Sequence, residues 1–432
     1  MAKTWRLAAA AALLGALGAC AERELILSGE REAIRPDSAV LEADDLPALT
    51  LPPARAQTDW THVAGNTTHK QDHAALELPL TQAWSVEIGR GATRRARLTS
   101  APIVAGGRAF AMDSAQTVTA LSTSGAVQWR TNLTPEGEQA DLGLGGGLAF
   151  DEGVLYATTG FGEVVALSPQ DGSVLWRTGL DATLQAAPAV SGGRVVAVTR
   201  ADTAFGLDAT TGGVVWRVQG VRLGAGFLGG ASPAIRGPVT VLPFRSGEVM
   251  GVLTSNGRRI WSAAISGGRR GLVRASISDV TGDPVIDNDI VYAGNQAGRL
   301  IALDRRSGER LWTQQEGALG PVVPVDNSLF LVTDAGEVMR LLASTGEIVW
   351  RQSLPLWERP ERRRGGITHY GPVLAGGRVL VAGSDGLIRA YDPTTGAEDA
   401  PTPLSGGAAS APIVAGGQLL VLTQAGRLVA FR

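Results

Sequence analysis

The chain has 432 residues, of which 44% are hydrophobic and 19% charged, and this apolar content excludes disorder for most of its length. The 39 basic and 41 acidic residues give a formal charge of −2, so no global positive field is available to hold nucleic acid. A single cysteine, Cys20, excludes an internal disulfide and any cysteine cluster for zinc or iron–sulfur.

The N-terminus, residues 1–19, is expected to be a signal peptide. A positively charged start precedes an uncharged apolar run over residues 7–18, which is too short to span a bilayer comfortably. The run ends in L-G-A-C at Cys20, which resembles a bacterial lipobox, in which the cysteine is lipidated and becomes the new N-terminus. The alternative is an ordinary signal peptide followed by an incidental cysteine. Ala21 is not the aspartate of an inner-membrane retention signal, so we expect a lipid anchor on the periplasmic face of the outer membrane.

Residues 20–57 are predicted to be a lipidated flexible tether. Acidic and basic residues alternate there without an apolar period, and four prolines (Pro36, Pro47, Pro52 and Pro53) interrupt regular structure. A random coil of this length spans roughly 35 Å. A folded body over residues 58–432 would therefore sit clear of the membrane while remaining anchored.

The rest of the chain is a repeat in which each unit ends in tryptophan. The repeated tryptophans are Trp129, Trp176, Trp216, Trp261, Trp312 and Trp350, each with a glycine four residues earlier. Most units open on a proline, as at Pro188 and Pro233, and alternating apolar residues with glycine turns fill the space between. Each unit therefore predicts four short antiparallel strands. We expect each tryptophan ring to pack over the seam to the next sheet, with its N–H bonded there.

The count of units predicts an all-β fold, an eight-bladed β-propeller of four-stranded antiparallel blades. Trp84 lies in a first strand that has no opening proline, and the last strands, from Pro412 onward, have no following tryptophan. These two half-units complete each other, so the N- and C-terminal strands close the ring. An eighth closing segment has Ala400 where tryptophan is expected.

The pattern G-x-V-x-A-L-D-x-x-T-G-x-x-x-W, with one copy at residues 163–172, resembles the repeat of pyrroloquinoline-quinone enzymes and their non-enzymatic relatives. The lipobox, the tether, eight repeats and the lack of inserted domains together resemble the BamB family, the lipoproteins of the outer-membrane β-barrel assembly machinery. Residues 145–149, 231–234 and 277–285 carry further similarity. The resemblance implies a non-enzymatic scaffold that binds the POTRA domains of BamA and aids insertion of outer-membrane proteins.

In that family, two loops on one propeller face contact BamA. The first loop maps onto residues 225–228, with Phe227 and Leu228, although the family's arginine is not at the matching place. Arg222 or Arg274 would supply that positive charge from nearby. The second loop matches at Asp279, while a further family aspartate falls on Thr281. The alternative is that Phe227 and Leu228 pack between blades and that Asp279 only accepts backbone N–H bonds.

Two other functions are alternatives to a scaffold. A quinone-dependent dehydrogenase would resemble the enzymes of the repeat family, many of which carry paired cysteines that this chain cannot form. A periplasmic propeller could instead hold a sugar or peptidoglycan fragment in its central channel. His69 and His73 stand four apart, but the sequence before them predicts a polar loop crossing the propeller, so neither a metal nor a cofactor is expected.

An arginine-rich insertion covers residues 358–366, after Trp350. Such a run is usually a solvated loop. The alternative is contact with an acidic partner surface or with lipid headgroups. The pairs Arg94-Arg95 and Arg269-Arg270 raise the same question less strongly.

Overall fold

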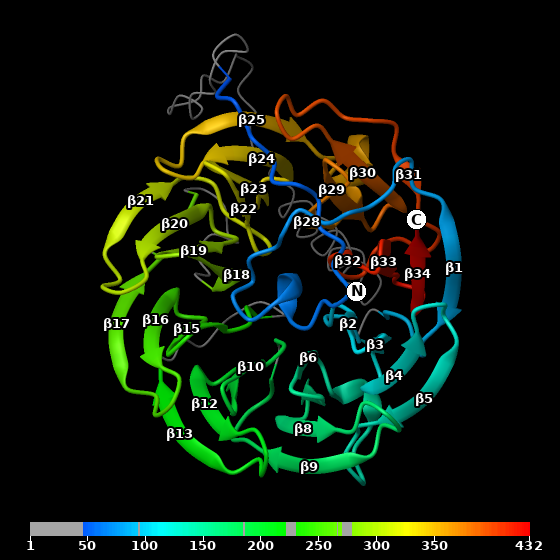
Figure 1. The fold of residues 1–432 in the computed structure, drawn as a ribbon, viewed down its shortest axis with the longest axis vertical. Coiled ribbons are helices and arrows are strands. Elements are labelled where there is room, and N and C mark those ends of the chain that lie inside the picture. The colour runs from blue at the N-terminus through cyan, green and yellow to red at the C-terminus, as the bar shows by residue number, and fades with distance from the viewer. Residues whose placement is uncertain (1–45, 94–95, 185, 222–229, 266, 270–278) are drawn as a thin grey trace, which may run out of the picture. The chain divides into compact units, whose positions relative to one another are not determined.

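A computed structural model describes residues 46–432, except 94–95, 185, 222–229, 266 and 270–278. Its strands form eight four-stranded sheets arranged as a ring (Figure 1). The predicted eight-bladed propeller is confirmed. Within the described ranges, no helix is long and apolar enough to cross a membrane.

The blades follow one another along the chain. The first blade has β2 (Ile103–Ala105), β3 (Arg108–Met112), β4 (Thr117–Ser122) and β5 (Val127–Asn132). The second has β6 (Gly146–Asp151), β7 (Val154–Thr159), β8 (Glu163–Leu167) and β9 (Val174–Gly179). The third has β10 (Ala189–Ser191), β11 (Arg194–Val198), β12 (Thr203–Asp208) and β13 (Val214–Gln219). The fourth has β14 (Ala234–Arg236), β15 (Val239–Pro243), β16 (Glu248–Leu253) and β17 (Arg259–Ala264).

The second half repeats this order. The fifth blade has β18 (Val280–Asp287), β19 (Ile290–Asn295), β20 (Arg299–Asp304) and β21 (Arg310–Gln314). The sixth has β22 (Val323–Val325), β23 (Ser328–Val332), β24 (Glu337–Leu342) and β25 (Ile348–Ser353). The seventh has β28 (His369–Ala375), β29 (Arg378–Gly383), β30 (Leu387–Tyr391) and the short β31 (Thr402–Pro403). Short 3₁₀ turns lie at η2 (Val63–Gly65), η3 (Ala140–Leu142) and η5 (Pro360–Arg362).

The eighth blade closes the ring. It joins β32 (Ile413–Ala415), β33 (Gln418–Leu422) and β34 (Arg427–Phe431) to the N-terminal strand β1 (Gln82–Glu87). Strand β1 pairs antiparallel with β34, and Trp84 lies opposite Ala430. The predicted closure by the two chain ends is confirmed, since strands from both ends complete one four-stranded blade.

Burial explains the strand sequences. The inner and middle strands lie between two neighbouring blades, so both of their faces are covered and they are apolar along their length, as in β2 and β15. The outer strands alternate, and in β13 the buried residue is Trp216. Clusters of buried side chains fill the spaces between neighbouring blades and form the core.

The tryptophans join successive blades, as predicted. Each indole N–H donates to a backbone carbonyl in the outer turn of the next blade, over 2.7–3.2 Å. The glycine of that turn lies against the ring: a Cβ on Gly172 would be 2.5 Å from Trp129 Cε3. Gly172 also has φ +74°, so the close approach and the backbone both require glycine.

Candidate partner-binding face

The two ends of the propeller differ because the strands of each blade are antiparallel. Every segment that leads from the outer strand of one blade to the inner strand of the next lies at one end, which we call the connecting face. Eight segments make this step, and their described residues belong to 87–103, 132–146, 179–189, 219–234, 264–280, 314–323, 353–369 and 403–413. The turns between first and second strands, such as 105–108, lie at the opposite face.

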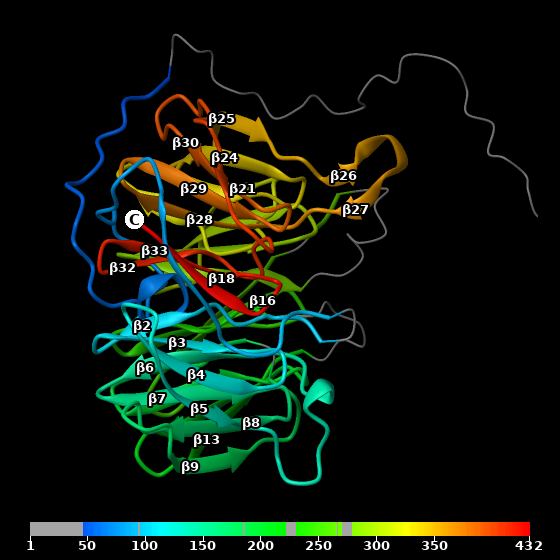
Figure 2. The ribbon, with the colours of Figure 1, turned by 90° about the vertical axis from the view of Figure 1, so that its right-hand side faces the viewer.

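The N-terminal part of the described chain occupies the centre of the ring, toward the opposite face (Figures 1 and 2). We call residues 57–77 the axial segment. It makes hydrogen bonds to seven blades, in each case to the innermost strand or to the turn that follows that strand. The residues whose backbone groups take part are Val104, Phe150, Val190, Ile235, Ile286, Leu374 and Gly416. The path predicted for this segment across the propeller is confirmed.

The sixth blade is reached by the preceding residues. Arg340, which is fully buried, donates from a guanidinium nitrogen to Pro47 O (2.9 Å), and Thr50 N–H donates to Asp326 Oδ2 (3.2 Å). Leu46, Leu49 and Leu51 pack against the core between the sixth and seventh blades. Residues 46–57 fall within the stretch assigned to the tether from sequence, and in the structure they contact the propeller.

The histidines of the axial segment are structural donors and acceptors. His62 Nε2 accepts the Val190 N–H (3.2 Å), and His69 Nδ1–H donates to Pro284 O (2.8 Å). Burial lowers the pKa of His62 to about 3, with a further decrease from nearby His69, and burial lowers the pKa of His69 to about 4. Both rings are therefore neutral near pH 7. Among the described residues, no three His, Asp or Glu side chains gather closely enough to hold a metal ion.

Of the residues predicted to contact a partner, one lies within the described part of the chain. Asp279 stands at the end of the connection into the fifth blade and is 3% exposed. Its carboxylate lies 3.8 Å from Arg245 Nε, an ion pair within the chain. Cys20, Phe227, Leu228, Arg222 and Arg274 lie outside the described residues.

Arg245 lies in the turn between β15 and β16 and bonds to two other segments of this face, the turn between β11 and β12 and the connection into the fifth blade. Its backbone N–H donates to Asp202 Oδ1 (2.8 Å), and its guanidinium donates to Arg200 O (2.9 Å) and faces Asp279. The sequence analysis did not single out Arg245. Its bonded groups belong to other parts of the chain, so no local pattern marks it.

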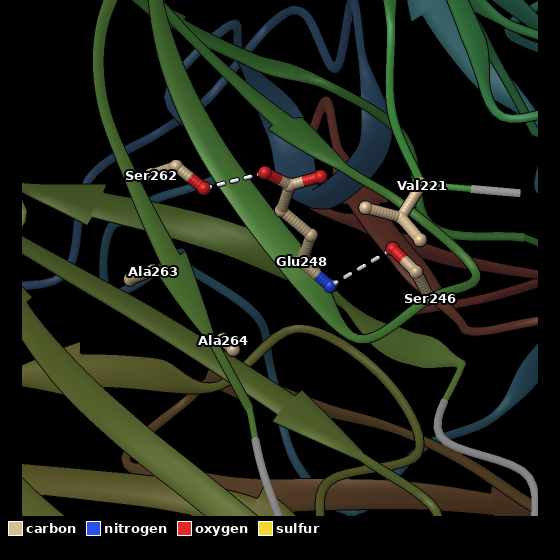
Figure 3. A pocket seen from close by; sticks show the side chains of 6 residues that line it. All are labelled: Val221, Ser246, Glu248, Ser262, Ala263 and Ala264. Carbon is tan, nitrogen blue, oxygen red and sulfur yellow. Dashed lines mark hydrogen bonds between the residues drawn. The ribbon is translucent and has the colours of Figure 1, made fainter.

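A shallow groove lies beside these connections, with a volume of about 350 Å³ (Figure 3). Its lining residues are Val221, Ser246, Glu248, Ser262, Ala263 and Ala264. Val221 is 60% exposed, although an apolar side chain gains by burial. Glu248 accepts the Ser262 hydroxyl on one carboxylate oxygen, and the other oxygen is shielded with no donor among the described residues. The groove therefore has an exposed apolar wall at Val221 beside a carboxylate that the hydroxyl of Ser262 holds in place.

Arg269 makes ion pairs within a second part of the connecting face. Its guanidinium bonds Asp334 (Nε to Oδ2, 2.9 Å) and Glu316, both buried. The bond to Asp334 raises the pKa of Arg269 further above its ordinary value. This arginine is thus bound within the chain, while Arg94, Arg95 and Arg270 lie outside the described residues.

The comparisons with known proteins agree with this architecture. The sequence profile of the family described as outer membrane protein assembly factor BamB matches residues 114–352 and 354–432. The chain belongs to the BamB family. BamB of Yersinia pestis is 26% identical over 357 residues, which cover 81% of this chain and 88% of that protein. BamB of Escherichia coli K12 is 28% identical over 351 residues, covering 80% and 87%.

Solved structures show the breadth of the fold. The crystal structure of BamB from Moraxella catarrhalis matches with a TM-score of 0.69 at 19% identity, covering 82% of this chain and 99% of that one. A europium-containing methanol dehydrogenase matches with a TM-score of 0.66 at 15% identity, covering 87% and 98%. At these identities the likeness shows the fold alone. Because the BamB fold is shared with dehydrogenases, function must be argued from the faces of this propeller.

Proposed function

We propose that this chain is a non-enzymatic scaffold lipoprotein of the outer-membrane β-barrel assembly complex. It binds the POTRA domains of BamA through its connecting face and aids insertion of outer-membrane proteins. A lipid on Cys20 anchors it at the periplasmic face of the outer membrane. The family match supports this role, because the relatives are named outer membrane protein assembly factors.

The observation that carries the proposal is the difference between the two faces. The axial segment occupies the ring's centre toward the opposite face, where His62 and His69 bond to the blades' own backbone. The connecting face instead carries exposed Val221 on the wall of a groove that is also lined by Ser246, Glu248 and Ser262. An exposed apolar side chain beside polar groups in a groove is a composition found at protein contacts.

The role of Asp279 in this proposal is to orient the contact segment. Its carboxylate is buried against Arg245, so it acts from beneath the surface that meets BamA. The residues that follow Val221, with Phe227 and Leu228, would supply the apolar anchor, and Arg222 or Arg274 the positive charge. This assignment rests on the family resemblance.

The test measures binding of the cognate BamA POTRA domains to the lipidated protein in mild detergent. Val221→Arg should weaken binding at least tenfold, because a charge replaces an apolar contact. Val214→Arg is the matched control: this valine is 50% exposed at the other end of the adjoining strand β13, and its variant should bind within twofold of wild type. Both variants should keep the wild-type melting temperature. Absence of any POTRA binding by wild type would overturn the proposal.

Enzymatic activity can be tested separately. Pyrroloquinoline quinone with calcium should produce neither dye-linked alcohol oxidation nor a thermal shift in the purified protein. A saturable shift together with turnover would replace the scaffold function by a quinoprotein activity.

A further inference from the structure

A two-stranded hairpin projects from the connecting face. Strands β26 (Trp357–Arg359) and β27 (Arg364–Gly366) pair only with each other, through Trp357 opposite Gly366 and Arg359 opposite Arg364. Figure 2 shows them extending beyond the blades, on the side away from the N-terminal part of the described chain. We call residues 356–366 the arginine hairpin. All of its residues are exposed.

The base of the arginine hairpin is built to hold it in place. Ile367 N–H donates to Leu356 O (2.9 Å), and the buried ring of His369 donates from Nε2 to Pro355 O (2.8 Å), so both legs are tied together. The Leu356 side chain packs on Gly336, where an added Cβ would lie 2.2 Å from Leu356 Cδ2. The hairpin is therefore an oriented arm, since its base is bonded and packed against the sixth blade.

The charges of the arm are unbalanced. It carries four arginines (Arg359, Arg362, Arg363 and Arg364) and two glutamates (Glu358 and Glu361), a net charge of +2. Within the described part of the chain, none of these four arginines has a carboxylate within 4 Å, in contrast to Arg269 with its two acidic partners. An exposed group of unpaired guanidinium ions favours a ligand with carboxylates or phosphates.

The order of residues along the arm indicates whether its ligand is a membrane or a protein. Its apolar residues, Leu356 (45% exposed) and Trp357 (38% exposed), stand at the base beside the ring, and the charges stand at the tip. A hairpin that enters a bilayer needs the reverse order, with apolar residues at the tip. A protein lying in the angle between arm and ring would bury Leu356 and Trp357 while its acidic groups meet the tip. Tryptophan with arginine is also the pairing enriched at protein hot spots.

We propose that the arginine hairpin is a second contact arm for the assembly partner and binds an acidic strip on its POTRA domains. The inference rests on the proposed function, and it extends the contact from the groove beside Val221 to the sixth and seventh blades. Because the tip charges are solvent-exposed, their main effect is to accelerate association and to make it depend on ionic strength.

The experiment uses the lipidated protein in detergent and the cognate POTRA domains, with association rates measured from low to high salt. The variant Arg362→Gln/Arg363→Gln/Arg364→Gln should associate about tenfold more slowly at low salt and lose most of the salt dependence. The matched control, Arg258→Gln/Arg259→Gln, removes exposed arginines at the opposite face and should behave as wild type. Trp357→Ser should speed dissociation with an unchanged melting temperature.

The outcomes are distinguishable. If wild type binds the POTRA domains and the triple variant binds identically, the proposal that the hairpin is a second contact is overturned, and the proposed function stands. If wild type does not bind them, the proposed function fails. Phosphatidylglycerol vesicles test the membrane as the alternative ligand. A triple variant that loses vesicle binding while keeping POTRA binding would assign the hairpin to the membrane and overturn the proposal.

Discussion

The buried histidines of the axial segment predict a loss of stability in acid. The unfolded chain protonates His62 and His69 near the ordinary pKa of 6.5, but their folded pKa values are about 3 and about 4. Stability from each ring is present above pH 6.5 and is lost as the pH falls from there toward the folded pKa. At pH 5 the loss is about 2 kcal/mol per ring, or about 4 kcal/mol together.

A carboxyl group on the connecting face opposes this trend. Burial raises the pKa of Asp283 to about 6, although the Ser232 N–H donates to it (2.6 Å). Below pH 6 the folded state holds a proton that the unfolded chain has released, so Asp283 restores about 1.4 kcal/mol between pH 7 and pH 5. The combined loss from His62, His69 and Asp283 over that interval is therefore about 2.5 kcal/mol, and His369, whose pKa burial also lowers, changes stability in the same direction as the other two histidines.

Urea unfolding followed by tryptophan fluorescence at pH 7, 6 and 5 measures this change. His62→Gln keeps an acceptor for Val190 N–H, and His69→Asn keeps a donor for Pro284 O at a residue whose φ of +60° asparagine tolerates. Between pH 7 and pH 5 the double variant should lose about 4 kcal/mol less stability than wild type, while Asp283→Asn should lose about 1.4 kcal/mol more than wild type. A double variant with the wild-type pH profile would refute the assignment of the loss to these rings.

Three further outcomes follow from the described contacts and the sequence. Gly172→Ala should lower the free energy of unfolding by about 3 kcal/mol, because the added Cβ meets the Trp129 ring. Gly193→Ala should lower it by about 1 kcal/mol, since Gly193 has a similar φ but open space around it. Urea midpoints measure both changes, and equal midpoints would contradict the packing argument. Arg340→Met leaves Pro47 O without its donor, so the free energy of unfolding should fall by about 3 kcal/mol and proteolysis near residue 47 should become faster. An unchanged cleavage rate would show that this bond does not hold the segment. Cys20→Ser should abolish lipid labelling and release the protein from membranes; retained label would sink the lipobox assignment.

The repeat was predictable from sequence because one local pattern recurs in each blade. The tryptophan, the glycine four residues before it and the opening proline fix strand ends and turns, so the number of blades and their closure follow from counting. The indole bonds were predictable for the same reason: an indole N–H at a seam between sheets needs a partner, and the turn of the next blade supplies one, as Trp350 finds in Pro393 O.

The candidate face was less predictable, because it depends on contacts between blades. Arg245 meets Asp279 across 34 positions of sequence, and Arg269 meets Asp334 across 65. Nothing in the local pattern of either arginine sets it apart from solvated arginines such as Arg258. The insertion at 358–366 was expected to be a solvated loop or a contact surface. It is exposed, as expected, but paired as a hairpin, because a turn at Pro360–Arg362 lets its short strands meet.

The axial segment also bonds to the blade whose outer seam has no tryptophan. The seventh blade has Ala400 where the other seams have tryptophan, and its outer strand β31 is only two residues long, so the indole bond to the eighth blade is missing there. The axial segment bonds this blade repeatedly. His73 Nε2 accepts the Gly377 N–H (2.9 Å) and its Nδ1–H donates to Pro52 O (2.7 Å), while Ala74 bonds to β28. At this seam, bonds from the centre of the ring therefore stand in place of the indole bond that joins the other blades at their outer turns.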